Sequence, residues 1–130
     1  MEERYLINTS AVVKYLNATF SPSGLNLMDR VIDSESTISL ITEIELRVWE
    51  PTNVLDKAIY ETFIDGSIVL DLNRDIVDQT IEVRKKYRLK LPDAFIAATA
   101  IINNLTLIAD NDKDFGKVDI LKYINPNHKK

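Results

Sequence analysis

Residues 91–115 read LPDAFIAATAIINNLTLIADNDKDF and predict a helix, a strand and an acidic loop in direct succession. Pro92 suits the first turn of a helix, and the residues after it are apolar on nearly every side, so this helix should lie deep in the fold. It should end around Asn103 and Asn104. Residues 105–109 are typical of a buried strand, because they are apolar and followed at once by polar residues.

The rest of the chain alternates in the same way between short apolar strands and helices. We expect strands at 5–7, 37–41, 67–70 and 120–124, and helices that begin near Ala11, Pro22, Thr42, Thr52 and Asn73. Thr42 and Thr52 are interpreted as the residues that cap their helices. The alternation indicates one α/β domain over residues 1–130, with a mainly parallel sheet that helices cover on both faces. The tail, residues 127–130, is expected to be disordered.

The composition is that of an ordinary globular domain, with 45% hydrophobic and 28% charged residues among 130. The net charge of -4 argues against binding nucleic acid by overall basicity, but divalent ions can supply positive charge where a phosphate must sit. The absence of Cys excludes disulfides and thiolate metal sites. No signal peptide and no membrane-spanning run is evident, so a soluble, cytoplasmic protein without a membrane partner is expected.

Polar and acidic residues follow several of the predicted strands. They are Asn8, Thr42, Glu45, Asp110, Asn111, Asp112 and Asp114, and Asp93 opens the buried helix. In an open parallel sheet the ligand crevice lies outside the carboxyl ends of the strands, so these side chains can meet at one edge. Carboxylates there would hold magnesium or manganese for phosphodiester hydrolysis.

Each of these residues also has a purely structural explanation. Asn8, Thr9 and Ser10 are natural helix caps, and Thr42 with Glu45 matches the capping box T-x-x-E. Asp93 lies where the dipole of a helix favours an anion, and Asp114 is suited to cap a turn at Phe115. The joint placement of the acids is stronger evidence for a site than any one of them alone.

Four stretches, in the same order along the chain, resemble the PIN-domain family and, within it, the VapC-type toxin ribonucleases. They are YLINTSAVVKYL at 5–16, ISLITEIEL at 38–46, LPDAFIAATAIINNLTLIADNDKDF at 91–115 and VDILKYINP at 118–126. The third is the most specific, because the acid, the Ala-rich helix, the strand and the N-x-x-D-F loop occur together. The resemblance implies a three-layer α/β/α sandwich that cuts RNA with magnesium or manganese.

Matched residue by residue, the resemblance implies a catalytic and metal-binding set of Asn8, Glu45, Asp93 and Asp114. It also implies assisting roles for Thr9 or Ser10, which match a hydroxyl residue that orders the site, and for Asn111. Asp110 and Asp112 are extra acids to which the resemblance assigns no role.

Asn8 departs from the family pattern, which has an aspartate at the end of the first strand. An amide offers a carbonyl oxygen to a cation but no negative charge, so metal affinity and activity should be weakened. A naturally degenerate site and an inactivating substitution made in a toxic protein both remain open as its origin.

The resemblance further implies an RNA substrate, a small antitoxin partner whose segment covers an apolar groove, and a homodimer. The alternative is a non-catalytic PIN-like module that binds RNA or antitoxin, and a third interpretation makes every acid a helix cap. One basic run, Arg84 to Lys90, suits either an RNA backbone or a solvated helix end.

Overall fold

The computed structural model describes residues 3–128 and contains five short strands. The strand β1 (Tyr5–Ile7) pairs with β4 (Thr106–Ile108), and β4 pairs with β5 (Tyr123–Ile124). A second pair is formed by β2 (Thr37–Ser39) and β3 (Ile68–Leu70), and β2 lies against β1. All three pairings are parallel, as the alternation of strands and helices predicts.

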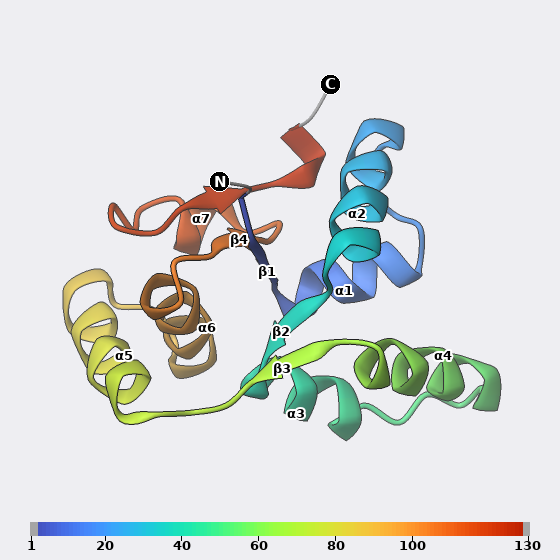
Figure 1. Cartoon of the computed structure of the whole chain (residues 1–130), viewed down its shortest axis with the longest axis horizontal. Coiled ribbons are helices and arrows are strands. Elements are labelled where there is room, and N and C mark those ends of the chain that lie inside the picture. The colour runs from blue at the N-terminus through green and yellow to red at the C-terminus, as the bar shows by residue number, and fades with distance from the viewer. Residues whose placement is uncertain (1–2, 129–130) are drawn as a thin grey trace.

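Seven helices connect these strands. Their bounds are α1 Thr9–Leu16, α2 Pro22–Ser34, α3 Leu40–Val48, α4 Val54–Asp65, α5 Arg74–Tyr87, α6 Leu91–Ile102 and α7 Asp112–Phe115. A 3-10 turn, Pro126–His128, ends the described chain. Figure 1 shows α5 and α6 on one side of the strands and α1 and α2 on the other.

The register of β1 against β4 explains why two cores form. Leu6 lies opposite Leu107, and Ile7 lies opposite Ile108. Successive side chains of a strand point to opposite faces, so Leu6 and Leu107 pack in the core under α5 and α6, while Ile7 and Ile108 pack in the core under α1 and α2. The sheet is therefore buried on both faces.

The helix α6 is deeply buried, as its sequence predicts. Its buried residues are Ala94, Ile96, Ala97, Ala98, Thr99 and Ala100. The small alanines let α6 approach both the sheet and α5 closely. The helix ends at Ile102 with Asn103 as its C-cap, and Asn104 follows with a left-handed φ of 54°, which closes the turn into β4.

Two of the predicted helix caps are wrong. The helix α3 begins at Leu40, and Ser39 caps it by accepting a hydrogen bond from the Thr42 N–H at 3.1 Å. The strand before it therefore ends at Ser39 rather than at residue 41. The helix α4 is capped by Asn53, whose Oδ1 accepts from the Leu55 N–H at 2.9 Å, and not by Thr52. In both places two cap-forming residues lie close in sequence, so the local pattern alone was ambiguous.

Part of the tail that is expected to be disordered instead forms the 3-10 turn. The Asn127 N–H donates to Asn125 Oδ1 at 2.9 Å, and Asn127 Nδ2 donates to Asp110 Oδ2 at 2.7 Å. The turn also packs on α2 so closely that a Cβ on Gly24 would lie 2.7 Å from the Pro126 carbonyl oxygen. Lys129 and Lys130 lie outside the described residues. Within residues 3–128, the helices are all too short or too polar to cross a membrane.

The burial of α6 generates a first prediction. Ala97 is 0% exposed at the centre of the core under α5 and α6. Ala97→Leu should overpack that core and lower the free energy of unfolding by about 1–3 kcal/mol, measured by urea denaturation. Ala58→Leu on the exposed face of α4 is the matched control and should change stability by less than about 0.5 kcal/mol. Equal stability of the two variants would contradict the assigned depth of α6.

Candidate active site

Three acids from separate elements converge at the carboxyl ends of the strands. Glu45 lies on α3, which starts directly after β2, Asp93 lies in the first turn of α6, and Asp114 lies on α7 after β4. Asp93 is half-buried, and burial is the largest cause that raises its pKa above the ordinary 3.8. The negative charges of Asp114 and Glu45 raise the pKa of Asp93 further, whereas Lys90 lowers it. The three carboxylates are therefore close enough for their charges to interact.

Hydroxyl groups hold Glu45 in place. Thr9 Oγ1 lies 2.6 Å from a carboxylate oxygen of Glu45 and 3.0 Å from Thr42 Oγ1. The Ser39 hydroxyl donates to Thr42 Oγ1 at 3.2 Å. This hydrogen-bonded chain joins the start of α1 to the start of α3. Thr42 and Glu45 do not form the capping box that their spacing indicates, because Glu45 is bound by Thr9 and the cap is Ser39.

Asn8 lies at the end of β1, and only 6% of it is exposed. It occupies the N-cap position of α1, yet its side chain makes no cap hydrogen bond. Its Nδ2 donates instead to Ser10 Oγ at 3.1 Å. The capping explanation therefore does not account for the Asn8 side chain. Because the amide nitrogen is engaged by Ser10, the Oδ1 atom is the group that Asn8 can offer to a cation.

Asn111 orients Asp114 through two hydrogen bonds. Asn111 Nδ2 donates to Asp114 Oδ2 at 3.0 Å, and the Asp114 N–H donates back to Asn111 Oδ1 at 3.3 Å. Asn111, not Asp114, is thus the cap of α7. The carboxylate of Asp114 is free of the cap role, which leaves it available to a ligand.

The two extra acids, Asp110 and Asp112, hold the C-terminal segment rather than joining the site. Asp110 forms an ion pair with Lys14 and accepts from Asn125 Nδ2 at 2.8 Å. Asp112 accepts from the Tyr123 hydroxyl at 2.6 Å, and this hydrogen bond is the largest cause that lowers the pKa of Asp112 to about 2.

His128 completes this arrangement from the 3-10 turn. Its Nε2 lies 2.5 Å from Asp112 Oδ2, and it also helps to lower the pKa of Asp112. The sequence shows none of these partners in advance, because Lys14 and the segment 123–128 are distant from the acids along the chain.

The oxygen atoms of these side chains are of the type that binds a hard divalent ion, although they do not form a complete coordination shell. Among residues 3–128, no three Asp, Glu or His side chains are arranged to hold a metal ion as they stand. Oxygen ligands from carboxylates and an amide are nevertheless those that magnesium and manganese prefer. The mutual repulsion that raises the pKa of Asp93 is also what a cation between the acids would relieve.

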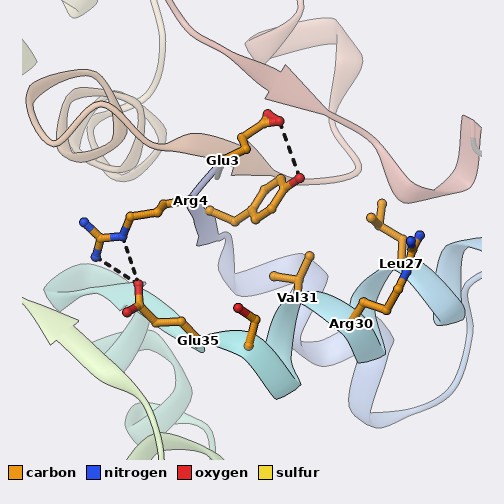
Figure 2. A pocket seen from close by; sticks show the side chains of 8 residues that line it. Glu3, Arg4, Leu27, Arg30, Val31 and Glu35 are labelled. Atoms are coloured by element: carbon orange, nitrogen blue, oxygen red, sulfur yellow. Dashed lines mark hydrogen bonds and ion pairs between the residues drawn. The ribbon is translucent and has the colours of Figure 1, made fainter. Parts of the chain in front are cut away.

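One sizeable cavity of the described chain lies away from these acids. About 520 Å³ in volume, it lies between the start of β1 and the C-terminal end of α2 (Figure 2). Three of its four charged side chains are engaged, because Arg4 binds Glu35 at 2.9 Å and Glu3 accepts from the Tyr5 hydroxyl at 3.4 Å, and Arg30 is the fourth. This cavity is at the amino end of β1, whereas the acids gather at the carboxyl ends of the strands.

Known proteins resemble this chain in sequence and in structure. A family model described as PIN domain matches residues 5–121. "Ribonuclease VapC2" of Methanocaldococcus jannaschii is 41% identical over 56 residues, which cover 43% of this chain and 38% of that protein. The chain thus matches well under half the length of that curated relative.

Two solved structures extend the likeness to almost the whole chain. A toxin-antitoxin complex from Klebsiella pneumoniae is similar with a TM-score of 0.74 and 25% identity, over 94% of this chain and 97% of that chain. DNA-bound VapBC from Salmonella typhimurium is similar with a TM-score of 0.79 and 19% identity, over 96% of this chain and 99% of that chain. The predicted α/β/α fold and the predicted family resemblance are both confirmed.

The crowding of carboxylates generates a second prediction. Asp93→Asn should raise the free energy of unfolding at pH 7 by roughly 0.2–1 kcal/mol, because it removes a half-buried charge that two acids repel. A raised pKa in the folded state makes the ionised carboxyl unfavourable only above the ordinary pKa, so the gain should vanish below pH 3.8.

Thermal unfolding of the metal-free protein across this pH range is the measurement. Asp119→Asn, an exposed acid in the loop after α7, is the control and should change little. A loss of stability in Asp93→Asn would mean that the favourable interaction with the dipole of α6 outweighs the repulsion.

Proposed function

The chain belongs to the PIN-domain family, and we propose that it is a VapC-type, metal-dependent endoribonuclease whose site is weakened by Asn8. The convergence of Glu45, Asp93 and Asp114 carries this proposal, because burial and the negative charges of Asp114 and Glu45 raise the pKa of Asp93, and a bound cation would offset that cost. The match to a ribonuclease supports the same reaction class.

In this proposal Glu45, Asp93, Asp114 and the Oδ1 atom of Asn8 hold magnesium or manganese. The bound ion would activate water and neutralise charge on the scissile phosphate. Thr9 keeps Glu45 turned towards the site, and Asn111 does the same for Asp114. Ser10 assists by fixing the amide of Asn8, so that its oxygen and not its nitrogen is available.

Because Asn8 is uncharged, the site has one negative charge fewer than the family pattern. Its amide oxygen can coordinate a cation, but it contributes no charge to attract one. We therefore expect the chain as it stands to bind the ion weakly and to cut RNA slowly.

Restoring the missing acid tests the proposal. Asn8→Asp should gain RNA cleavage in the presence of manganese by at least about tenfold over the unchanged chain, since a single well-placed catalytic group is worth about that or more. Adding Asp93→Asn to Asn8→Asp should abolish the gain. Cleavage of several labelled RNAs, with and without a chelator, is the measurement.

Glu45 supplies the control that separates chemistry from folding. In the Asn8→Asp background, Glu45→Gln should lower cleavage strongly while leaving the melting temperature nearly unchanged, because Thr9 can still donate to the amide oxygen. A large fall in melting temperature would assign Glu45 a structural role instead. If Asn8→Asp cleaved none of the RNAs tried, the catalytic proposal would be contradicted.

A non-catalytic module is the second candidate, and Asn8 is the observation that favours it. Among the described residues, no three side chains are arranged to bind a metal ion, which agrees with a fold that binds RNA or antitoxin without cleaving RNA. Calorimetry distinguishes the two candidates. Failure of Asn8→Asp to bind manganese at millimolar concentration would favour the module.

We propose a small antitoxin as the protein partner, covering an apolar groove. The groove has a volume of about 540 Å³, and its lining residues are Leu16, Leu55, Ala58, Ile59, Thr62 and Phe63. Leu55 is 72% exposed and Ile59 is 48% exposed, which is costly for side chains of this size unless another surface covers them. The similar toxin-antitoxin complex supports this partner class. A homodimer is proposed from the same likeness, and analytical ultracentrifugation measures it.

A growth assay tests the groove. The active Asn8→Asp chain should arrest cells, and co-expression of its antitoxin should rescue them. Adding Leu55→Glu and Ile59→Glu should leave the arrest but prevent the rescue, because charge in the groove opposes an apolar partner. Glu50→Gln, an exposed change outside the groove, should still be rescued. Full rescue of the groove variant would place the antitoxin elsewhere.

A further inference from the structure

A row of basic residues follows one face of α5 towards its C-terminal end. Ile81, Arg84, Lys85, Arg88 and Leu89 line a shallow hollow of about 510 Å³. Ile81, Arg84 and Lys85 are three and four residues apart, which places them on one face of the helix, and Arg88 and Leu89 follow directly after its last residue. The opposite face packs against the core through Ile76, Thr80 and Val83. We use the term basic stripe for Arg84, Lys85 and Arg88.

The charge of this surface is opposite to that of the chain as a whole. The protein carries a net charge of -4, yet the segment from Arg84 to Lys90 has five cations and no acid. In the described part of the chain, none of these five forms an ion pair with a carboxylate. The acids nearest in sequence are Glu82 before this segment and Asp93 after it. Five cations against these two acids leave the surface with a net positive charge.

The helix dipole explains only part of this charge. Cations in the last turn, such as Lys85, are favoured by the partial negative charge there. Arg88 lies beyond the helix, at a left-handed φ of 58°, where glycine would avoid the strain that a side chain brings. The Arg88 side chain thus occupies a costly position, and within residues 3–128 it forms no hydrogen bond or ion pair that would offset the cost.

A hydrogen bond fixes the Arg84 side chain beside the hollow. Its Nε donates to the Leu89 carbonyl oxygen at 3.1 Å, across the end of α5. This hydrogen bond fixes the plane of the guanidinium group and leaves its two terminal nitrogens for another acceptor. A planar, fixed guanidinium is well suited to a phosphate. The apolar residues Ile81 and Leu89 lie beside it in the same hollow.

The basic stripe lies close in sequence to the acidic site. Lys90 is the N-cap residue of α6, and its charge acts on Asp93 three residues later. Arg88 and Asp93 are five residues apart, so even a fully extended chain would separate them by at most about 18 Å. A strand of nucleic acid whose phosphate lies at the acids can therefore extend over the stripe.

We propose that the basic stripe binds the phosphate backbone of the RNA strand next to the cleaved phosphate. This inference rests on the proposed ribonuclease function and adds the surface that positions the substrate. Contacts to phosphate carry no sequence information, so the stripe supplies affinity and orientation, and the choice of sequence lies elsewhere. Because the chain as a whole is acidic, a local basic surface favours the approach of RNA.

RNA binding without cleavage tests the proposal. The unchanged Asn8 chain is titrated, in a chelator, into a labelled single-stranded RNA of about 20 nucleotides, and fluorescence anisotropy is followed between about 50 and 200 mM salt. Lys85→Gln with Arg88→Gln should weaken binding by roughly tenfold and reduce the slope of log affinity against log salt by about 1.4, since each lost phosphate contact removes about 0.7.

Lys57→Gln with Lys117→Gln is the matched control, because it removes the same charge from exposed positions on α4 and after α7. The control should keep the salt slope. Circular dichroism melting shows whether each variant is folded, and glutamine at position 88 carries the same backbone strain as arginine.

Three results would overturn the proposal. Equal salt slopes for the stripe variant and the control would assign the effect to overall charge. Absence of RNA binding by the unchanged chain would remove the stripe's role. Binding of poly-glutamate with the same loss in the stripe variant would assign the stripe to an acidic protein. Manganese-dependent cleavage by Asn8→Asp is measured separately, so a failed stripe and a failed ribonuclease are told apart.

Discussion

Burial raises the pKa of Asp93, and the negative charges of Asp114 and Glu45 raise it further because each of these acids is held by a different element of the fold. Acids on a mobile loop would move apart, and the contribution of their repulsion to the pKa of Asp93 would be lost. Here the parallel sheet is buried on both faces, so β2 and β4 deliver α3 and the segment with α7 to the same edge. The buried helix α6 fixes Asp93 beside them. The energy of two apolar cores is thus what keeps like charges together, and that stored repulsion favours a cation.

Uncharged polar residues around the acids orient the carboxylate groups. Thr9 joins α1 to Glu45, and Asn111 joins the start of α7 to Asp114. Neither residue carries a charge, so neither cancels the field that attracts a cation. Asp110 and Asp112 show the contrast, because lysine, histidine, tyrosine and asparagine side chains surround them and lower their pKa values. Acids of the same loop therefore differ: Asp110 and Asp112 are neutralised by the folded structure, whereas Asp114 is the member of the loop that we propose for metal binding.

Much of this arrangement could be predicted from the sequence, where the pattern is local and strong. The apolar run of α6, the strand β4 and the acidic loop after it are adjacent in the chain, so their order alone predicts the edge at which Asp93 and Asp114 meet. The caps of α3 and α4 could not be assigned securely, because Ser39 and Thr42, like Thr52 and Asn53, are all good cap formers. The anchoring of the C-terminal turn was missed, since Asn125 and His128 contact their partners only through the folded structure.

The strands at the two ends of the hydrogen-bonded pairings have a further consequence. β5 contains two residues and β3 contains three, and side-chain hydrogen bonds from Tyr123 and Asn125 tie β5 to the neighbouring loop. Long, flat borders of a sheet invite strands from other molecules to add on, which leads to aggregation. Edge strands this short offer few backbone groups for the addition of another strand, and a tyrosine and an asparagine hold one of them in place by hydrogen bonds. The exposed apolar groove on α4 is therefore not accompanied by a long sheet edge that would favour the addition of strands from other molecules.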